Sequence, residues 1–352
     1  MHTILTTGGL GYIGSHTAIS LLKKGFNVLI IDSLINSKEE TFCKIKKIIE
    51  KEKLEGKLFL RKGDLRNKLW LESIFQEFSD LNMAIESVIH FAGLKSVNES
   101  ILNPLLYWDM NVNSTLSLLN VMYKFSCYKL IFSSSATVYK TDKNKKLSEN
   151  NLLGPINPYG KTKLCIERIL EDLIKSDDKK WRIACLRYFN PCGAHDSGLI
   201  GENPVSDHLN IFPVIFKVIN KDIEKLPIYG SDWPTKDGTC VRDYIHVMDL
   251  ADAHVSALLH ISENKPNLIY LNIGTGNGVS VLELVQTFSA VNSCKIPYYL
   301  TDRRQGDSPF VVADNSLALK LIPWEPKKNL KDMCFDSWSW FLKNRQINNN
   351  SK

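Results

Sequence analysis

The sequence predicts an α/β protein with a doubly wound parallel sheet and a smaller C-terminal region. Three observations support this fold class: a glycine-rich loop between an N-terminal strand and helix, short apolar strands alternating with helices up to about residue 188, and polar or glycine residues where those strands end. Strands that alternate with helices form a parallel sheet, and ligands bind beyond the carboxyl ends of its strands.

The first unit surrounds the glycine loop at residues 8–14 (Gly-Gly-Leu-Gly-Tyr-Ile-Gly). Residues 4–6 are predicted as a buried strand, a helix follows the loop to about Lys24, and residues 27–31 form the next strand. Such a loop lets the backbone approach a pyrophosphate at a helix N-terminus. Asp32 ends the second strand, where a carboxylate can bind an adenosine ribose. No Arg follows it, so this Rossmann-type unit is expected to bind NAD rather than NADP.

The later strands are expected to end at one edge of the sheet. They are predicted at 57–61, 87–91, 129–132 and 182–186, with helices at 104–125 and 158–175, and their ends carry Asp64, Gly93, Ser135 and Asn190. Beyond residue 190, helices are predicted at 211–220, 249–259, 279–290 and 330–342, with one strand at 268–273. We therefore expect an NAD-binding domain at 1–188, a mainly substrate-binding region at 189–345 with some chain returning to the first domain, and a disordered tail at 346–352.

Tyr159 and Lys163 lie one turn apart at the start of a predicted helix. Asn157 suits the N-cap and Pro158 the first helical position. The helix dipole, the Lys163 ammonium and a cationic cofactor could together lower the tyrosine pKa from its usual value of about 10. Taken alone, the pair also fits an ordinary amphipathic helix start. After an NAD fingerprint and a serine-ended strand, it indicates acid/base chemistry.

Composition excludes several classes of function. The 352 residues carry a net charge of +6 spread along the chain, so nucleic-acid binding is not expected. The eight cysteines form no Cys-x-x-Cys pair, which indicates reduced thiols and no metal site. No stretch has the roughly 18 apolar residues of a membrane span, and no signal-peptide pattern precedes the first strand. A cytoplasmic enzyme with a small anionic substrate is expected.

Taken together, the motifs resemble the extended short-chain dehydrogenase/reductase family, and within it the nucleotide-sugar 4-epimerases that act on UDP-galactose and UDP-glucose. The resemblance covers nearly the whole chain. Besides the glycine loop and the Tyr159–Lys163 pair, it rests on residues 63–64, 91–95 (Phe-Ala-Gly-Leu-Lys), 133–139 (Ser-Ser-Ser-Ala-Thr-Val-Tyr), 187–191 (Arg-Tyr-Phe-Asn-Pro), 237–247 and 303–307.

The resemblance implies a reversible 4-epimerisation through a 4-keto sugar with tightly bound NAD. Tyr159 is then the acid/base, Lys163 lowers its pKa and holds the nicotinamide ribose, and Ser135 binds the oxygen at C4. Related 4,6-dehydratases carry an Asp-Glu pair near this strand end, where the present chain has Ala136 and Thr137. The rival readings are another NAD-dependent nucleotide-sugar enzyme of the family and a catalytically silent NAD-binding protein.

The resemblance also assigns binding residues. The cofactor set is Gly8, Gly11, Tyr12, Ile13, Gly14, Asp32, Ser33, Leu34, Asn36, Ser37, Asp64, Leu65, Phe91, Ala92, Gly93, Lys95, Asn111, Ser133, Tyr159, Lys163 and Phe189. The UDP-sugar set is Lys95, Ser135, Tyr159, Asn190, Asn210, Tyr229, Arg242, Arg304, Asp307 and Val311. A homodimer through helices 104–125 and 158–175 is expected.

Two positions depart from the family pattern. Residues 206–209 (Ser-Asp-His-Leu) replace the usual Asn-Asn pair before Asn210, which leaves the alignment of residues 203–212 open. Val311 stands where a bulky Tyr is associated with glucose and galactose only, and a small residue leaves room for an N-acetyl group. Conversion of UDP-GlcNAc and UDP-GalNAc is therefore expected, unless a one-residue slip places Phe310 in the pocket.

Overall fold

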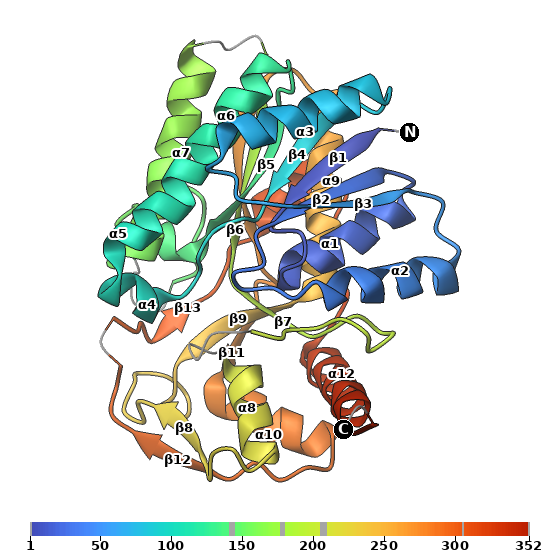
Figure 1. Cartoon of the computed structure of the whole chain (residues 1–352). Coiled ribbons are helices and arrows are strands. Elements are labelled where there is room, and N and C mark those ends of the chain that lie inside the picture. The colour runs from blue at the N-terminus through green and yellow to red at the C-terminus, as the bar shows by residue number, and fades with distance from the viewer. Residues whose placement is uncertain (1, 141–144, 177–179, 205–209, 305, 351–352) are drawn as a thin grey trace.

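A seven-stranded parallel sheet forms the centre of the larger part of the protein (Figure 1). The computed structural model describes residues 2–140, 145–176, 180–204, 210–304 and 306–350, with side chains described up to 345. The strand order is β10-β6-β5-β4-β1-β2-β3, which confirms the predicted fold class. The strands are β1 (Thr3–Thr7), β2 (Asn27–Asp32), β3 (Leu58–Lys62), β4 (Ile85–His90), β5 (Lys129–Ser135), β6 (Arg182–Tyr188) and β10 (Asn267–Ile273).

Helices cover both faces of this sheet because alternate strand residues point to opposite sides. Ile4 and Ile30 pack into one apolar core, whereas Leu5 and Leu29 pack into the other. Strands buried on both faces often read as continuous apolar runs, as residues 28–31 of β2 do, whereas β1 (Thr-Ile-Leu-Thr-Thr) is fully buried with three threonines. The first core includes α1 (Tyr12–Lys23), α2 (Glu40–Glu52) and α9 (Val247–Glu263); the second includes α3 (Lys68–Asp80), α6 (Ser114–Lys124) and α7 (Pro158–Ser176).

A smaller region with its own apolar core lies beyond the carboxyl ends of the central strands (Figure 1). Its mixed sheet is centred on β9 (Val241–His246), which pairs with β7 (Asn190–Cys192), β11 (Gly278–Ser280) and β13 (Phe310–Val311). β8 (Leu226–Tyr229) and β12 (Tyr298–Thr301) form a separate parallel pair. The helices of this region are α8 (Ile211–Ile219), α10 (Val281–Val291) and α12 (Leu330–Asn350), whereas α11 (Ser316–Leu321) packs on the first core of the large sheet.

Several predicted elements differ in detail. The helix predicted at 104–125 is α5 (Pro104–Tyr107) and α6, joined by a π-helical turn at Trp108–Asn113. Val279 lies in β11 instead of a helix, and Ser280 caps α10 by accepting a hydrogen bond from the Glu283 N–H at 3.0 Å. The backbone of residues 346–350 continues α12, since a helix anchored upstream gains one hydrogen bond for each residue added, and the disorder expected for the tail stays a prediction. Residues 351–352 lie outside the described chain.

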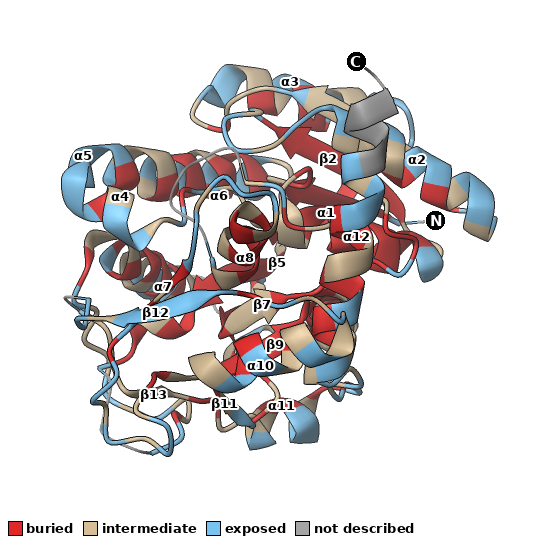
Figure 2. Cartoon of the chain, turned by 90° about the horizontal axis from the view of Figure 1, so that it is seen from below, coloured by how far each residue is buried: buried red, intermediate tan, exposed pale blue. Residues whose placement is uncertain are grey.

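Buried residues concentrate on the sheet and on the inner faces of its helices, whereas α4 (Val97–Leu102) and α5 are largely exposed (Figure 2). α2, α3 and α4 were not singled out from the sequence. Among the helices of the described chain, none is both long enough and apolar enough to cross a membrane.

Candidate active site

The glycine loop forms a tight cradle at the start of α1. Gly8 has a φ of +65°, and a Cβ atom there would lie 2.8 Å from the Ala92 nitrogen. A Cβ atom on Gly14 would lie 2.6 Å from the Gly8 oxygen. Gly11 caps α1 without any side-chain hydrogen bond, and the first turn of this described helix holds no acid. Its N-terminal N–H groups therefore fit an anion such as a pyrophosphate, and Tyr12 and Ile13 belong to that turn.

Asp32 ties the glycine loop to the loop that follows β2. Its buried carboxylate accepts hydrogen bonds from the Leu10 N–H at 2.9 Å, the Leu34 N–H at 2.9 Å and the Ser37 hydroxyl at 2.7 Å. Ser33 and Asn36 are exposed in the same loop. The structure thus brings the predicted ribose-binding acid beside the predicted pyrophosphate cradle.

Asp64 and Leu65 follow β3 along the same edge of the sheet. The Asp64 carboxylate pairs with the Arg66 guanidinium, and this hydrogen-bonded cation lowers the Asp64 pKa. Arg66 also pairs with Asp109 in the π-helical turn. Leu65 is buried in the core. The Arg66 pairing was not anticipated, and it links the β3 edge to the turn that carries Asn111.

Asn111 holds the loop after β4, which contains Phe91, Ala92, Gly93 and Lys95. Its Oδ1 accepts from the Leu94 N–H at 2.7 Å, and its Nδ2 donates to the Leu94 oxygen at 3.1 Å and to the Thr162 hydroxyl at 3.0 Å. The buried amide, predicted as a cofactor contact, is thus bonded within the chain. It joins the β4 loop to α7, and the π-helical turn aims it there; such turns are frequent at functional sites.

The predicted catalytic residues meet at the end of β5. Asn157 accepts from the Gly160 N–H at 2.8 Å and α7 begins at Pro158, as the sequence indicates. Lys163 Nζ donates to the Ser133 oxygen at 2.7 Å and lies 5.8 Å from the centre of the Tyr159 ring. The Ser135 Oγ accepts from the Thr137 N–H at 3.2 Å and the Thr137 hydroxyl at 3.0 Å. These two donors leave the Ser135 proton free to be donated.

In the chain alone, the pKa of Tyr159 is shifted upward, whereas the sequence led us to expect a lowered pKa. Burial raises the pKa of Tyr159, and a hydrogen bond with Ser135 opposes this only in part. Burial also lowers the pKa of Lys163 to about 8, while the Glu167 carboxylate acts in the opposite direction. The predicted lowering of the tyrosine pKa is thus not a property of the chain alone, because desolvation outweighs its favourable contacts.

Four predicted UDP-sugar residues form one cluster in the smaller region, the arginine cluster. Asp307 lies 3.2 Å from Arg304 Nε and 3.5 Å from Arg242 Nη2, and the Arg304 guanidinium lies 4.5 Å from the centre of the Tyr229 ring. These residues come from β8, β9 and the loop before β13. Planar guanidinium groups beside an aromatic ring fit a nucleoside diphosphate.

Glu202, which the sequence reasoning did not single out, contacts two of the predicted substrate residues. Its buried carboxylate lies 3.4 Å from Lys95 Nζ and accepts a hydrogen bond from the Asn210 amide at 2.6 Å. Both partners are predicted substrate residues from opposite sides of the site. Nothing in the local pattern of residues 201–204 marks this glutamate, because the contacts depend on tertiary packing. Residues 205–209, which include the whole divergent 206–209 segment, lie outside the described chain.

Val311 and Phe310 face opposite sides of β13. Val311 packs against the cluster of Ala136 and Phe189 at the end of β5, whereas Phe310 Cε2 lies 3.5 Å from a Cβ atom built on Gly278. Val311 is thus the member of the pair that packs next to Ala136, the residue after Ser135. Asn190 begins β7 and is in register with Tyr244 of β9, so it lies in the smaller sheet, two residues after β6 ends in the large one.

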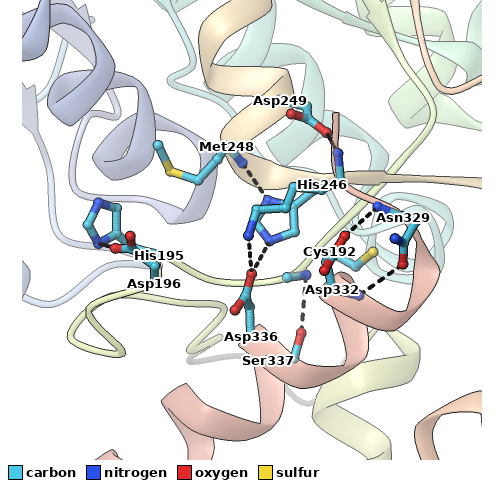
Figure 3. Close-up of polar contacts among 12 residues, drawn as sticks. Cys192, His195, Asp196, His246, Met248, Asp249, Asn329, Asp332, Asp336 and Ser337 are labelled. Atoms are coloured by element: carbon cyan, nitrogen blue, oxygen red, sulfur yellow. Dashed lines mark hydrogen bonds and ion pairs between the residues drawn. The ribbon is translucent and has the colours of Figure 1, made fainter. Parts of the chain in front are cut away.

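A second polar cluster joins α12 to the cofactor side (Figure 3). Ser337 accepts from the Gly193 N–H at 3.1 Å, and the Gly193 oxygen accepts from the Tyr12 hydroxyl at 2.6 Å. Beside it, His246 Nε2 lies 3.1 Å from Asp336 and Nδ1 accepts from the Met248 N–H at 3.1 Å (Figure 3). The C-terminal helix therefore braces the first turn of α1 through Gly193.

One group near this cluster has metal-ligand spacing. Glu52, His195 and Asp196 bring three candidate ligand atoms within 4.8 Å of one another. His195 Nδ1 is hydrogen-bonded to the Ser197 hydroxyl at 2.9 Å, and Asp196 is exposed. Hydrogen bonds within the 195–197 turn thus account for the position of the imidazole.

The chain is similar to known proteins over nearly its whole length. The family model described as GDP-mannose 4,6 dehydratase matches residues 5–336. UDP-glucose 4-epimerase of Bacillus subtilis (strain 168) is 45% identical over 337 residues, 96% of each chain. The solved UDP-glucose-4-epimerase of Stenotrophomonas maltophila, with bound NAD and formylated UDP-arabinopyranose, has a TM-score of 0.92 at 40% identity, covering 99% of this chain and 100% of its own. That of Bifidobacterium longum, with NAD+ and UDP, has a TM-score of 0.90 at 42% identity, covering 97% and 99%.

Proposed function

The chain belongs to the UDP-glucose 4-epimerase family, within the group that the GDP-mannose 4,6 dehydratase model describes, and from this membership we propose how its residues interconvert UDP-galactose and UDP-glucose. The enzyme is an NAD-dependent isomerase that inverts C4 of the sugar reversibly, with no net redox change. The observation that carries the proposed mechanism is the assembly of Tyr159, Lys163 and Ser135 at the end of β5, opposite the glycine cradle.

Tyr159 takes the proton from the sugar 4-hydroxyl. It returns the proton after the 4-keto sugar has rotated in the site and presents its other face. NAD, when bound, supplies the acceptor and donor of the C4 hydride. Ser135 donates its free proton to the oxygen at C4, since both hydrogen bonds from Thr137 leave that proton available. Lys163 keeps a cation next to the Tyr159 ring, which favours the phenolate.

Epimerisation fits this site better than dehydration. A dehydratase must remove water from the sugar with an acid and a base beside the transferred hydride. The 3-10 turn after β5 carries Ala136 and Thr137 instead, and Thr137 is committed to Ser135. The elimination step therefore has no acid at this position, although the matching family model takes its description from a dehydratase.

The arginine cluster and Glu202 form the proposed UDP-sugar side. Asp307 holds Arg242 and Arg304 in place within the chain and accepts uridine ribose hydroxyls in the complex, which frees guanidinium N–H groups for the diphosphate. Tyr229 stacks against uracil. Lys95 and Asn210, held by Glu202, contact the hexose, with Asn190 at the start of β7.

Val311 supports a broad sugar range. It faces the Ala136 cluster, while Phe310 faces Gly278, so the small residue of the pair lies on the sugar side. We propose that UDP-GlcNAc and UDP-GalNAc are also interconverted. Equal exposure of the enzyme to this pair with no product formed would refute the proposal.

A homodimer through the helices of 104–125 and 158–175 stays a proposal, supported by exposed apolar residues at and just before the first of them. Contiguous apolar surface on a soluble domain marks an interaction site. Figure 2 shows the exposed helices α4 and α5, and sedimentation that finds only monomer at working concentrations would contradict a dimer. The exposed side chains are Ile101, Leu102, Leu105, Leu106, Trp108, Leu116 and Tyr123.

The proposed organisation keeps 1–188 as the NAD-binding part and 189–345 as mainly substrate-binding. α9 and β10 belong to residues 189–345 but pack on the large sheet, which supports the proposal that some of this chain returns to the first domain. The proposed compartment is the cytoplasm; the eight free thiols support it, because reducing compartments keep cysteines in this form.

One experiment separates the epimerase from its rivals. The purified protein is given UDP-galactose without added NAD, and the nucleotide sugars are separated. The expected result is UDP-glucose, formed with no stoichiometric change in reduced-nicotinamide absorbance. An unchanged substrate peak favours a silent NAD-binding protein, and stoichiometric absorbance favours a net oxidoreductase.

A further inference from the structure

Two consecutive turns of α7 contact two consecutive residues at the end of β5. Lys163 Nζ donates to the Ser133 oxygen at 2.7 Å, and Glu167 Oε1 accepts from the Ser134 hydroxyl at 2.6 Å. The next residue of β5 is Ser135. Because side chains four apart share one helix face, Lys163 and Glu167 lie together over the strand end.

Glu167 is held from the other side by a buried arginine. Arg187 donates from Nε and Nη2 to the two Glu167 oxygens at 2.9 and 2.8 Å. Arg187 lies on β6 in register with Ser134 on β5, so both point to α7 from neighbouring strands. The pair is almost completely buried, with side-chain exposures of 3% and 1%.

Two tyrosine rings pack against the guanidinium group of Arg187. Its guanidinium lies 4.9 Å from the centre of the Tyr139 ring and 4.5 Å from that of Tyr270, and it donates to the Tyr139 hydroxyl at 2.9 Å. Tyr139 donates onward to Asn272 at 2.6 Å. A buried ion pair is often no more stable than an apolar replacement, so conformational or functional specificity is the role to test for this one.

We propose that Glu167, fixed by Arg187, is a positioning residue for the catalytic pair: it keeps Lys163 charged and holds the end of β5 that presents Ser135. The proposal rests on the proposed epimerase function. Glu167 is hydrogen-bonded to Ser134 and Arg187, neither of which is a predicted substrate or cofactor residue. Its carboxylate is the negative charge next to an ammonium that burial otherwise drives toward neutrality.

The other groups around Lys163 do not replace this charge. Tyr159 and the Phe132 ring offer only aromatic faces, with Lys163 Nζ 5.8 and 5.0 Å from their centres. His90 of β4 is neutral in the working range, since burial and the Lys163 cation lower its pKa to about 3. Arg187 is a cation. The Ser133 oxygen and the two rings contact the ammonium without carrying a charge, so Glu167 is the anion among these described neighbours.

The test is Glu167→Gln in the holoenzyme, which keeps the shape and removes the charge. We expect NAD retention and UDP binding to stay unchanged, while the pKa of Lys163 falls by about one unit. Since Lys163 then loses its proton at lower pH, the alkaline limb of the kcat profile moves down by the same amount. NMR titration of isotope-labelled lysines follows Lys163 directly, with its resonance assigned by loss in Lys163→Met.

Asp172→Asn is the control. Asp172 lies further along α7, largely exposed and 3.6 Å from Lys175 Nζ, and the change should leave both titrations unmoved. Glu167→Gln could fail to fold because Arg187 is left unpaired. In that case the double variant Glu167→Gln with Arg187→Gln removes both charges, and it should lower the pKa of Lys163 by a smaller amount.

The outcomes separate the two proposals. If the Lys163 resonance titrates at the wild-type pH in both Glu167→Gln and the double variant, the proposed role of Glu167 is overturned. A wild-type protein that forms no UDP-glucose, but whose Lys163 resonance shifts in Glu167→Gln, overturns the proposed epimerisation and leaves this positioning intact.

Discussion

The cofactor side and the substrate side of the site are held in different ways. On the cofactor side, Gly8, Gly14 and Asp32 are fixed by strand ends, a helix start and backbone N–H groups. On the substrate side, Arg242 and Arg304 are held through Asp307, a side chain from a loop. A site built from backbone geometry suits a ligand that stays bound. A site built from side-chain ion pairs suits a ligand that enters and leaves. The charged side chains pair with one another when the ligand is absent and with the ligand when it is bound.

Tyr159→Phe should have the largest effect and spare both binding sides. Without the hydroxyl no group removes the 4-hydroxyl proton, and kcat should fall by about a thousandfold, within the range known for acid–base groups. Epimerisation kinetics measure the loss, and bound NAD and UDP affinity serve as the control. Turnover within tenfold of the wild type would show that another group is the base.

Lys163→Met tests the charge on the cofactor side. Removal of the cation raises the pKa of Tyr159, which must lose its proton, so the acidic limb of the rate profile should move to alkaline pH by about one unit or more. At neutral pH the rate should fall at least tenfold. A rate lowered equally at every pH would contradict an electrostatic role.

Arg304→Ala tests the substrate side alone. Loss of charge-assisted hydrogen bonds should weaken UDP binding about tenfold or more, while NAD retention is unchanged. Calorimetry with UDP measures the first and absorbance of the purified protein the second. Arg303→Ala is the control, because Arg303 pairs with Asp232 and lies 3.9 Å from the Trp233 ring centre, away from the arginine cluster. Equal losses in the two variants would refute the assignment.

Val311→Tyr should have the smallest effect on the main reaction. A larger side chain beside the Ala136 cluster leaves UDP-galactose turnover within about twofold but removes room at C2, so turnover of the N-acetylated sugars should disappear. Phe310→Leu, on the other face of β13, should change neither. Loss of N-acetyl turnover in Phe310→Leu alone would place the wrong residue of the pair on the sugar side.

The cofactor side was largely predictable because its signals are local. Residues 8–14, Asp32 and the Ser135 strand end lie on regular elements whose apolar pattern the sequence displays. The short strands β8, β12 and β13 were missed, since two to four residues carry too little periodicity.

Contacts between distant side chains were not predictable from the same signals. Glu202 meets Lys95 and Asn210, and Glu167 meets Arg187, only after the chain has folded. The burial of Tyr159 was not predictable for a related reason: the helix start and the neighbouring lysine are visible in the sequence, whereas the desolvation that raises this pKa in the chain alone is a property of tertiary packing.

The return of α9 and β10 to the large sheet has an evolutionary consequence. The chain leaves the NAD-binding part after β6, builds β7, α8, β8 and β9, returns through α9 and β10, and leaves again toward β11. The substrate side is therefore not one continuous segment of the chain, and a single recombination event could not exchange it. New sugar specificities on this scaffold must arise by replacements such as those at Val311, or by changes in single loops, while the interleaved halves are inherited together.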